Sequence, residues 1–276
     1  MSQMPDADYR QIRAVNCSGL KLFADSPLHF WHRYLNPDRA PETPSKALRL
    51  GTLIHCRALE GLEEFNSRYV RKGEYKRNTK EGKAAHEAFL ASMPEGAEII
   101  EQDEWDQALD VAHALLKSTA ASNLLEGAHG YSEEVIQWVD EESGLLCKAK
   151  MDRIQTINGK TYIVDLKTCS QFYGGAGPKG FSKSAANFKY HWQAAFYLDG
   201  LRASGEFGEV EDFVFVVVEK EPPYGVGIYR ASDQFVQIGR DQYREAMENF
   251  AVCQRDDHWP GYDTKIVDLE LPRWAA

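Results

Sequence analysis

Residues 148–168, KAKMDRIQTINGKTYIVDLKT, contain two runs rich in β-forming residues on either side of an Asn-Gly pair. Asn-Gly is the preferred pair for a two-residue hairpin turn, because both central residues of that turn have a positive φ. A turn at residues 158 and 159 places Asp152 directly opposite Asp165, with Cβ atoms about 5 Å apart. Side chains alternate along a strand, so Lys167 projects from the same face as Asp165. The stretch therefore predicts a hairpin that gathers two carboxylates and a lysine.

Two like charges directly opposite one another destabilise a sheet, so a second group must offset them. A divalent cation held by both carboxylates would do so, and Mg²⁺ and Mn²⁺ prefer oxygen ligands. Lys167 beside the cation could orient or deprotonate a water and balance phosphate charge, which are elements of metal-assisted phosphodiester hydrolysis. The alternative is a plain hairpin in which Asp152 and Asp165 form surface salt bridges with Lys150 and Lys167.

The composition is that of a folded globular protein with an excess of acid. The 276 residues are 43% hydrophobic and 27% charged, and the formal net charge is -10. This length can bury a sizeable core without a disulfide or a structural metal. Proteins that coat nucleic acid non-specifically usually carry a broad basic surface, so the net charge argues against that class. It does not exclude a DNA enzyme, because metal-binding carboxylates add negative charge and a substrate groove can be locally basic.

Cysteine usage and hydropathy point to a cytoplasmic protein. The five cysteines are scattered singly, without a CxxC motif, so neither a disulfide framework nor a zinc ribbon is predicted. The N-terminus lacks an apolar signal core, and no run of about 18 apolar residues occurs. We therefore expect neither export nor a membrane span.

The chain is expected to form one α/β domain over residues 1–276. Residues 1–125 should be mainly helical, residues 126–255 should form the sheet and its flanking helices, and residues 256–276 form an aromatic and acidic tail. Ser18 is the expected N-cap of the first helix. The Gly-, Ser- and Lys-rich segment 171–185 is expected to be a mobile loop. Further helices are expected near residues 45–62, 80–92, 101–119, 186–203 and 232–254.

Basic residues concentrate in one window. Residues 68–83 hold seven Lys or Arg against two Glu, and such a run is either a solvated face or a phosphate-binding surface. The Gly-rich segment 174–180 lacks the GK[ST] ending of a P-loop, so a nucleotide site is not predicted there. The candidate phosphate contacts are Lys76, Arg77, Lys80, Lys179, Lys183 and Lys189.

Four features follow one another in an order known from a large family. They are GTLIH at 51–55, an acid at Glu134 on the strand before Asp152, DLK at 165–167, and QAAFY at 193–197. The sequence resembles the PD-(D/E)XK nucleases, in the branch of phage-type and RecB-type exonucleases. Over roughly residues 15–255 it is most similar to the nuclease domain of RecE, exonuclease VIII. The resemblance implies a mixed central sheet flanked by helices.

The resemblance also implies roles for individual residues. Asp152 and Asp165 match the metal-binding acids, and Lys167 matches the catalytic lysine. Glu134 matches an acid that serves a second metal or the attacking water, although a shift of one residue to Glu133 stays open. The implied metal ligands are His55, Asp152, Asp165 and the main-chain carbonyl of Leu166.

Gln193 and Tyr197 are four residues apart and therefore share one helix face. In the family this pair faces the active site and contacts DNA; the alternative is that Tyr197 packs in the core. Related nucleases with an iron-sulfur cluster carry a group of cysteines near the C-terminus, whereas only Cys253 lies late in this chain. We therefore expect no iron-sulfur cluster.

The expected function is a Mg²⁺-dependent exodeoxyribonuclease, with Mn²⁺ as a substitute metal. The resemblance implies digestion of linear double-stranded DNA from 5′ to 3′, leaving 3′ single-stranded tails for recombination. It also implies a homo-oligomeric ring, such as a tetramer, around DNA ends and a single-strand annealing protein as partner. The alternatives are an endonuclease or single-strand nuclease of the same fold, and a catalytically idle DNA-binding module.

Overall fold

The computed structural model describes residues 4–40, 43, 45–76, 78–262 and 265–271, and its centre is a five-stranded mixed sheet. The strand order is β3-β4-β5-β6-β7. The β5–β6 pair is parallel and the other three pairs are antiparallel. The strands are β3 (Gly130–Val139), β4 (Leu146–Ile157), β5 (Lys160–Cys169), β6 (Val210–Glu219) and β7 (Val226–Arg230).

The β4–β5 hairpin has the predicted turn and register. Asn158 and Gly159 have φ of +51° and +78°, as this turn requires, and Ile157 pairs with Lys160. The ladder runs outward from the turn to the pair Arg153 and Val164 and stops there. The predicted register is therefore confirmed, but Asp152 and Asp165 lie just beyond the last ladder pair.

Strand alternation sends two sets of apolar side chains to opposite faces of the sheet. On β6, Phe213, Phe215 and Val217 join one buried cluster, while Val216 and Val218 join the other. The first cluster is completed by α2 (Cys17–Asp25), α3 (Pro27–Tyr34), α10 (Tyr190–Ser204) and α11 (Asp233–Asp256). The second is completed by α4 (Lys46–His55), the π-helix η1 (Cys56–Glu60), α5 (Gly61–Arg68), α7 (Gln102–Lys117) and α8 (Thr119–Leu125).

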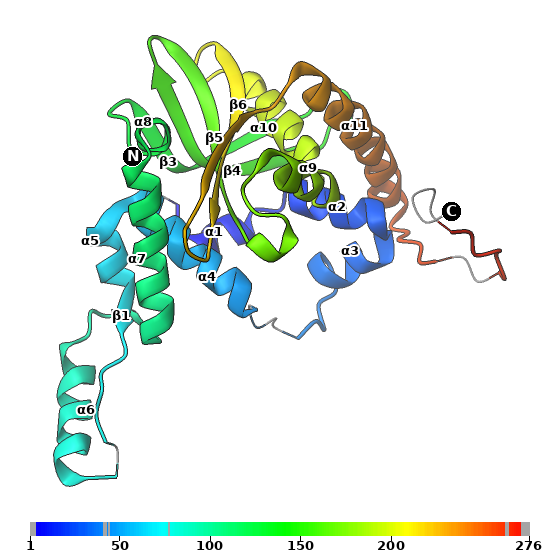
Figure 1. The fold of residues 1–276 in the computed structure, drawn as a ribbon. Helices are drawn as coiled ribbons and strands as arrows, with labels where there is room; N and C mark the ends of the chain where they lie inside the picture. Colours follow the sequence, from blue (N-terminus) through cyan, green and yellow to red (C-terminus); the bar gives the residue numbers. More distant parts are fainter. Residues whose placement is uncertain (1–3, 41–42, 44, 77, 263–264, 272–276) are drawn as a thin grey trace.

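Figure 1 shows the resulting layers, with α2, α10 and α11 on one side of the sheet and α4, α5 and α7 on the other. This arrangement confirms the expected α/β class with a mixed sheet between helices. Within the described ranges, no helix combines the length and apolar character needed to cross a bilayer.

Two local predictions were wrong. The first long helix is capped by Asn16, whose Oδ1 accepts a hydrogen bond from the Gly19 N–H at 2.7 Å, so Ser18 is not the cap. Segment 171–185 is largely ordered: it contains the 3₁₀ turn η2 (Gln171–Tyr173) and most of the helix α9 (Pro178–Asn187). Pro178 stands in the first helical turn, where its fixed φ favours a helix start.

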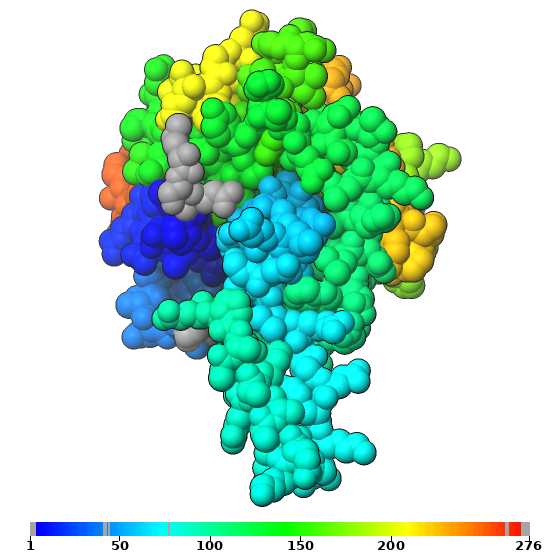
Figure 2. Space-filling model, turned by 90° about the vertical axis from the view of Figure 1, so that its left-hand side faces the viewer, coloured from blue at the N-terminus to red at the C-terminus, as the bar shows by residue number. Residues whose placement is uncertain are grey.

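A helical arm projects from the body of the molecule. Strands β1 (Tyr69–Arg71) and β2 (Glu98–Ile100) pair in parallel at its base, and α6 (Lys80–Ser92) forms its length. Figures 1 and 2 both show the arm extending away from the sheet and its covering helices. The most basic window of the sequence therefore begins in α5 and runs out along this arm.

Candidate metal centre

The site begins at a break between two strands. Ser132 pairs with Arg153 and Glu134 pairs with Met151, so Glu133 falls opposite Asp152 at the one position of this ladder that is not paired. Glu133 has a φ of +56°, a backbone conformation that costs a non-glycine residue on the order of 1–3 kcal/mol and that concentrates at functional sites. The break turns the Glu133 side chain toward Asp152 and α4.

His55, the last residue of α4, brings an imidazole to these two carboxylates. One ligand atom from each of His55, Glu133 and Asp152 lies within 4.8 Å of the other two. The His55 Nδ1 lies 3.6 Å from Asp152 Oδ2. The π-helix η1 starts at the next residue, Cys56, and such π turns are frequent at functional sites because they re-aim side chains.

Asp165 and Lys167 form an adjoining ion pair on β5. The Asp165 carboxylate contacts the Lys167 ammonium and accepts a hydrogen bond from Gln193 Nε2 at 2.6 Å. The Asp165 side chain is only 2% exposed and that of Lys167 is 17% exposed, so water screens this pair weakly. Asp165 is therefore turned toward Lys167 and Gln193 and lies outside the His55–Glu133–Asp152 group.

Asp152 connects the two parts of the site. Its Oδ2 accepts a hydrogen bond from the Leu166 N–H at 2.8 Å, which takes the place of the strand pairing that ends at Arg153. Burial, and then repulsion by the Asp165 carboxylate, raise the pKa of Asp152 to about 7, against the opposing influence of His55 and Lys167. In the metal-free protein Asp152 therefore holds a proton more strongly than an ordinary aspartate does, and a bound cation would relieve the same repulsion.

Lys167 remains a cation in this environment. Burial disfavours its charge, but the carboxylates of Asp165 and Asp152 outweigh that effect and hold the pKa of Lys167 above its ordinary value. The Lys167 Nζ also lies 4.8 Å from the centroid of the Tyr190 ring, a favourable cation–π distance.

The alternative, in which Asp152 and Asp165 form salt bridges with Lys150 and Lys167, holds only for the second pair. Lys167 does pair with Asp165, but Lys150 pairs with Glu133 at 2.7 Å and with Asp6 at 2.5 Å. No ion pair between Lys150 and Asp152 exists among the described residues. The Asp152 carboxylate therefore contacts His55 and the Leu166 N–H instead of a lysine.

Both parts of the site open into a cleft of about 1660 Å³. Its lining includes His55, Glu133, Asp152, Leu166 and Lys167. Several arginines from the N-terminal segment and α3 also line it, which the sequence reasoning missed because they are spread over separate helices and loops. These arginines are Arg10, Arg13, Arg33 and Arg39.

The donor set fits a divalent cation. One imidazole and two carboxylates converge, and carboxylate oxygens are the ligands that Mg²⁺ and Mn²⁺ prefer. Leu166 lines the cleft next to Asp165, where a main-chain ligand was predicted. His55, Glu133 and Asp152 would hold the ion, with the Asp165 carboxylate beside them in a separate pair with Lys167.

Of the two adjacent glutamates that the sequence left open, Glu133 is the one that lies with His55 and Asp152. Glu134 lies outside the cluster of possible ligands, and Glu133 takes the place predicted for it. Glu134 pairs with Met151, a buried member of the first core cluster, and burial together with the Glu206 carboxylate raises the pKa of Glu134. Gln193 faces the site through Asp165, while Tyr197 is partly buried against the first core cluster, 6.2 Å from the Phe213 ring between centroids. The position of Tyr197 is thus that of a core residue next to the site.

The predicted phosphate contacts occupy three places. Lys76 and Lys80 lie on the arm, and Lys179 and Lys183 are exposed on α9. Lys189 precedes α10 and pairs with Asp25 at 2.6 Å. Arg77 lies outside the described residues.

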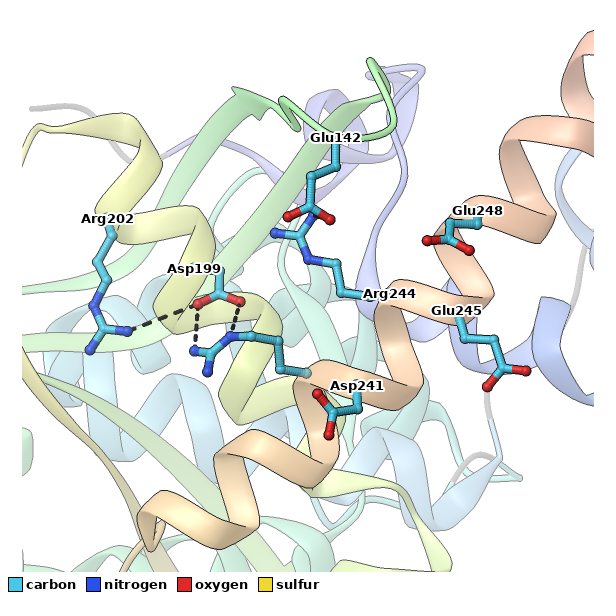
Figure 3. Close-up of a pocket in the computed structure, with 8 residues that line it drawn as sticks. Glu142, Asp199, Arg202, Asp241, Arg244, Glu245 and Glu248 are labelled. Atoms are coloured by element: carbon cyan, nitrogen blue, oxygen red, sulfur yellow. Dashed lines mark hydrogen bonds and ion pairs between the residues drawn. The ribbon is translucent and has the colours of Figure 1, made fainter.

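A second pocket, of about 600 Å³, is formed by charged residues of α10, α11 and the β3–β4 turn (Figure 3). Asp199 binds Arg240 through both carboxylate oxygens, at 2.7 and 2.8 Å. Arg244 pairs with Asp140 at 2.5 Å and with Glu142 at 3.5 Å. These pairs tie α11 to α10 and to the sheet, so the pocket is part of the helix packing.

The chain matches a family model over most of its length. The model is described as "PDDEXK-like domain of unknown function (DUF3799)" and matches residues 16–269. No curated protein matches the sequence.

A solved structure shares the fold. A protein from Eubacterium rectale described as a "Putative exonuclease" has a TM-score of 0.65 and 17% sequence identity, covering 99% of this chain and 96% of that chain. At that identity the likeness shows the fold alone. A structure described as SSO0001 covers 83% of this chain and 84% of its own at 13% identity, and its TM-score of 0.29 is too low to carry an argument.

Proposed function

Since the chain belongs to the family of PDDEXK-like domains, within the PD-(D/E)XK superfamily, we propose that it is a metal-dependent nuclease that hydrolyses phosphodiester bonds in DNA. One observation carries the proposal: the His55, Glu133 and Asp152 ligand atoms converge in the same cleft as the buried Asp165–Lys167 pair. The family match and the fold of the Eubacterium rectale protein support a nuclease.

The chemistry divides between the two parts of the site. A divalent cation at His55, Glu133 and Asp152 would polarise a phosphoryl oxygen and make a water more acidic. Lys167 has its pKa raised by Asp165 and Asp152, so it acts as a fixed cation that stabilises charge developing on the phosphate. Asp165, which accepts a hydrogen bond from Gln193, holds the ammonium in position. The arginines that line the cleft supply further contacts for the phosphates of the strand, as basic grooves do in other nucleic-acid enzymes.

The finer proposal is an exonuclease that uses Mg²⁺, or Mn²⁺ in its place, and digests linear duplex DNA from 5′ to 3′. The resemblance to RecE-type nuclease domains supports the polarity. The description of the Eubacterium rectale protein as an exonuclease agrees with this mode.

The test uses linear duplex labelled at either the 5′ or the 3′ ends, and covalently closed circular duplex of the same sequence. We expect Mg²⁺-dependent release of the 5′ label first, with the circle left intact. Cleavage of the circle would favour an endonuclease, and early release of the 3′ label would reverse the polarity. DNA binding without any hydrolysis in Mg²⁺ or Mn²⁺ would identify a catalytically idle module.

We further propose that the protein forms a homo-oligomeric ring on DNA ends and leaves 3′ tails for a single-strand annealing protein. A ring allows an acidic outer surface, consistent with the net charge of -10, to surround a locally basic path. Sedimentation velocity should give a species several times the 31.3 kDa chain mass. A monomer at all concentrations, free and with DNA, would contradict the ring.

A further inference from the structure

An exposed phenylalanine stands beside the site. Phe188, between α9 and α10, is 61% exposed. The next residue, Lys189, has a φ of +51°, an uncommon conformation for a residue with a side chain. This turn ends α9 and begins α10 within two residues, and leaves the Phe188 ring at the surface.

Ring contacts connect Phe188 to Lys167. The Phe188 and Tyr190 rings stack at 5.8 Å between centroids, with an interplanar angle of 28°. Tyr190 lines the cleft, and its ring centroid lies 4.8 Å from Lys167 Nζ. Phe188 is therefore in contact with a ring that lines the cleft, and one aromatic ring separates it from the lysine of the site.

Cations accompany this ring. The Lys21 Nζ donates a hydrogen bond to the Phe188 carbonyl oxygen at 2.9 Å and lies 5.6 Å from the Tyr190 centroid. Lys189 adds a second ammonium, which is paired with Asp25 at 2.6 Å. Helix α2 carries Lys21 and helix α9 ends just before Phe188, and the two helices lie side by side in Figure 1.

We propose that Phe188 is a stacking platform for an unpaired base at the end of the DNA strand that enters the cleft, with Lys21 beside it for the adjoining phosphate. This inference rests on the proposed function. Exposed aromatic rings interleaved with cations are the surface that binds single-stranded nucleic acid, because every base has a face that can stack. The platform selects unpaired over paired ends and accepts all four bases.

The competing aromatic pair is Phe172 and Tyr173 on η2. These residues are 87% and 74% exposed, and their rings contact each other at 5.2 Å between centroids. The described contacts link Phe188, through Tyr190, to Lys167, and this distinguishes it from Phe172. Phe172→Ala is therefore a matched control.

The experiment measures binding of a single-stranded oligodeoxynucleotide of about 12 residues, with 2-aminopurine as its terminal base, to the full chain in EDTA. Wild type should quench the fluorescence on binding. Phe188→Ala should weaken binding roughly 5- to 150-fold and abolish the quench, while Phe188→Tyr should restore both and Phe172→Ala should match wild type. Thermal melts of each variant establish that it is folded.

Two results would overturn the inference. One is Phe188→Ala that binds and quenches as wild type does; the other is an equal loss in Phe172→Ala. Because the assay requires no hydrolysis, it separates this inference from the proposed function. Wild type that digests linear duplex while Phe188→Ala binds normally refutes the stacking platform alone, whereas wild type inactive on every DNA refutes the nuclease.

Discussion

At the scale of single residues, Asp152 interacts with groups from both parts of the site. Its carboxylate is close to Asp165, accepts the Leu166 N–H and faces His55. Because the folded protein raises the pKa of Asp152 from 3.8 to about 7, it binds this proton more tightly than the unfolded chain does. The contribution of Asp152 to the stability of the metal-free protein therefore falls as pH rises from about 4 to about 7.

Asp152→Asn removes the charge and keeps an acceptor for the Leu166 N–H. We expect it to raise the free energy of unfolding of the metal-free protein at about pH 8 by on the order of 2–4 kcal/mol, and to make no difference below about pH 4. Urea unfolding in EDTA at both pH values measures this. A variant less stable than wild type at the higher pH would show that Asp152 is not strained when ionised.

Glu133 and Glu134 provide a matched pair for the identity of the site acid. Glu133→Gln should weaken Mn²⁺ binding by at least about tenfold, because it removes a charged ligand. Mutating residues that only hydrogen-bond to metal ligands already lowers metal affinity by about 10-fold or more. Glu134→Gln should bind Mn²⁺ as wild type does. Isothermal titration of both variants with Mn²⁺ measures this. Weaker Mn²⁺ binding in Glu134→Gln, with Glu133→Gln unchanged, would identify Glu134 as the metal ligand.

Lys167→Met tests the ion pair and the chemistry together. It leaves the Asp165 carboxylate, whose side chain is 2% exposed, buried without its cation, which should cost about 3–5 kcal/mol in the free energy of unfolding. DNA hydrolysis should fall by at least about 100-fold. Lys160→Met, at an exposed lysine paired with Glu211, should change neither. Activity within a few-fold of wild type in Lys167→Met would remove the lysine from the mechanism.

At the scale of elements, helix α4 has a glycine where packing does not demand one. A Cβ at Gly51 would meet no atom within 4 Å, whereas a Cβ at Gly239 on α11 would overlap the His191 carbonyl of α10. Gly51 lines the cleft one helical turn before His55, so its missing side chain leaves room beside the imidazole. Gly239 is instead required by the contact between two helices.

Alanine substitution should therefore have opposite effects at these two glycines. Gly51→Ala should raise the free energy of unfolding by about 0.5–1 kcal/mol, because alanine has the higher helix propensity, and should lower the DNA hydrolysis rate. Gly239→Ala should destabilise by about 1–3 kcal/mol through overpacking. Thermal melts and hydrolysis rates measure both. A Gly51→Ala enzyme of full activity would show that the cleft does not need this space.

At the scale of the whole molecule, an acidic chain carries a cleft lined by arginines. Substrate phosphates that contact these arginines release counterions, so DNA affinity should fall steeply with salt. Arg13→Ala should weaken duplex binding and reduce the slope of log affinity against log salt by about 0.9. Arg255→Ala, at a residue paired with Asp256 on the end of α11, should leave the slope unchanged. Equal slopes in all three proteins would place the DNA outside this cleft.

Much of the architecture follows from local pattern. Asn158 and Gly159 set the hairpin register, because few other pairs accept two positive φ values. Alternation along β5 places Asp165 and Lys167 on one face, and they do form a pair. These predictions concern neighbours along one strand or across one turn, where short-range geometry decides the outcome.

Tertiary structure decided which side chains complete the site. The resemblance implied an acid at Glu134 or, shifted by one residue, at Glu133, and the unpaired position opposite Asp152 brings Glu133 to the site. A break of this kind in a strand ladder has no signature in the local sequence. Asp165 accepts a hydrogen bond from Gln193, a residue 28 positions later, because buried carboxylate oxygens need hydrogen-bond donors. His55 meets Asp152 across almost a hundred residues. Local sequence patterns were therefore enough to predict the hairpin and its register, while contacts between distant elements determined which acid and which ring stand beside it.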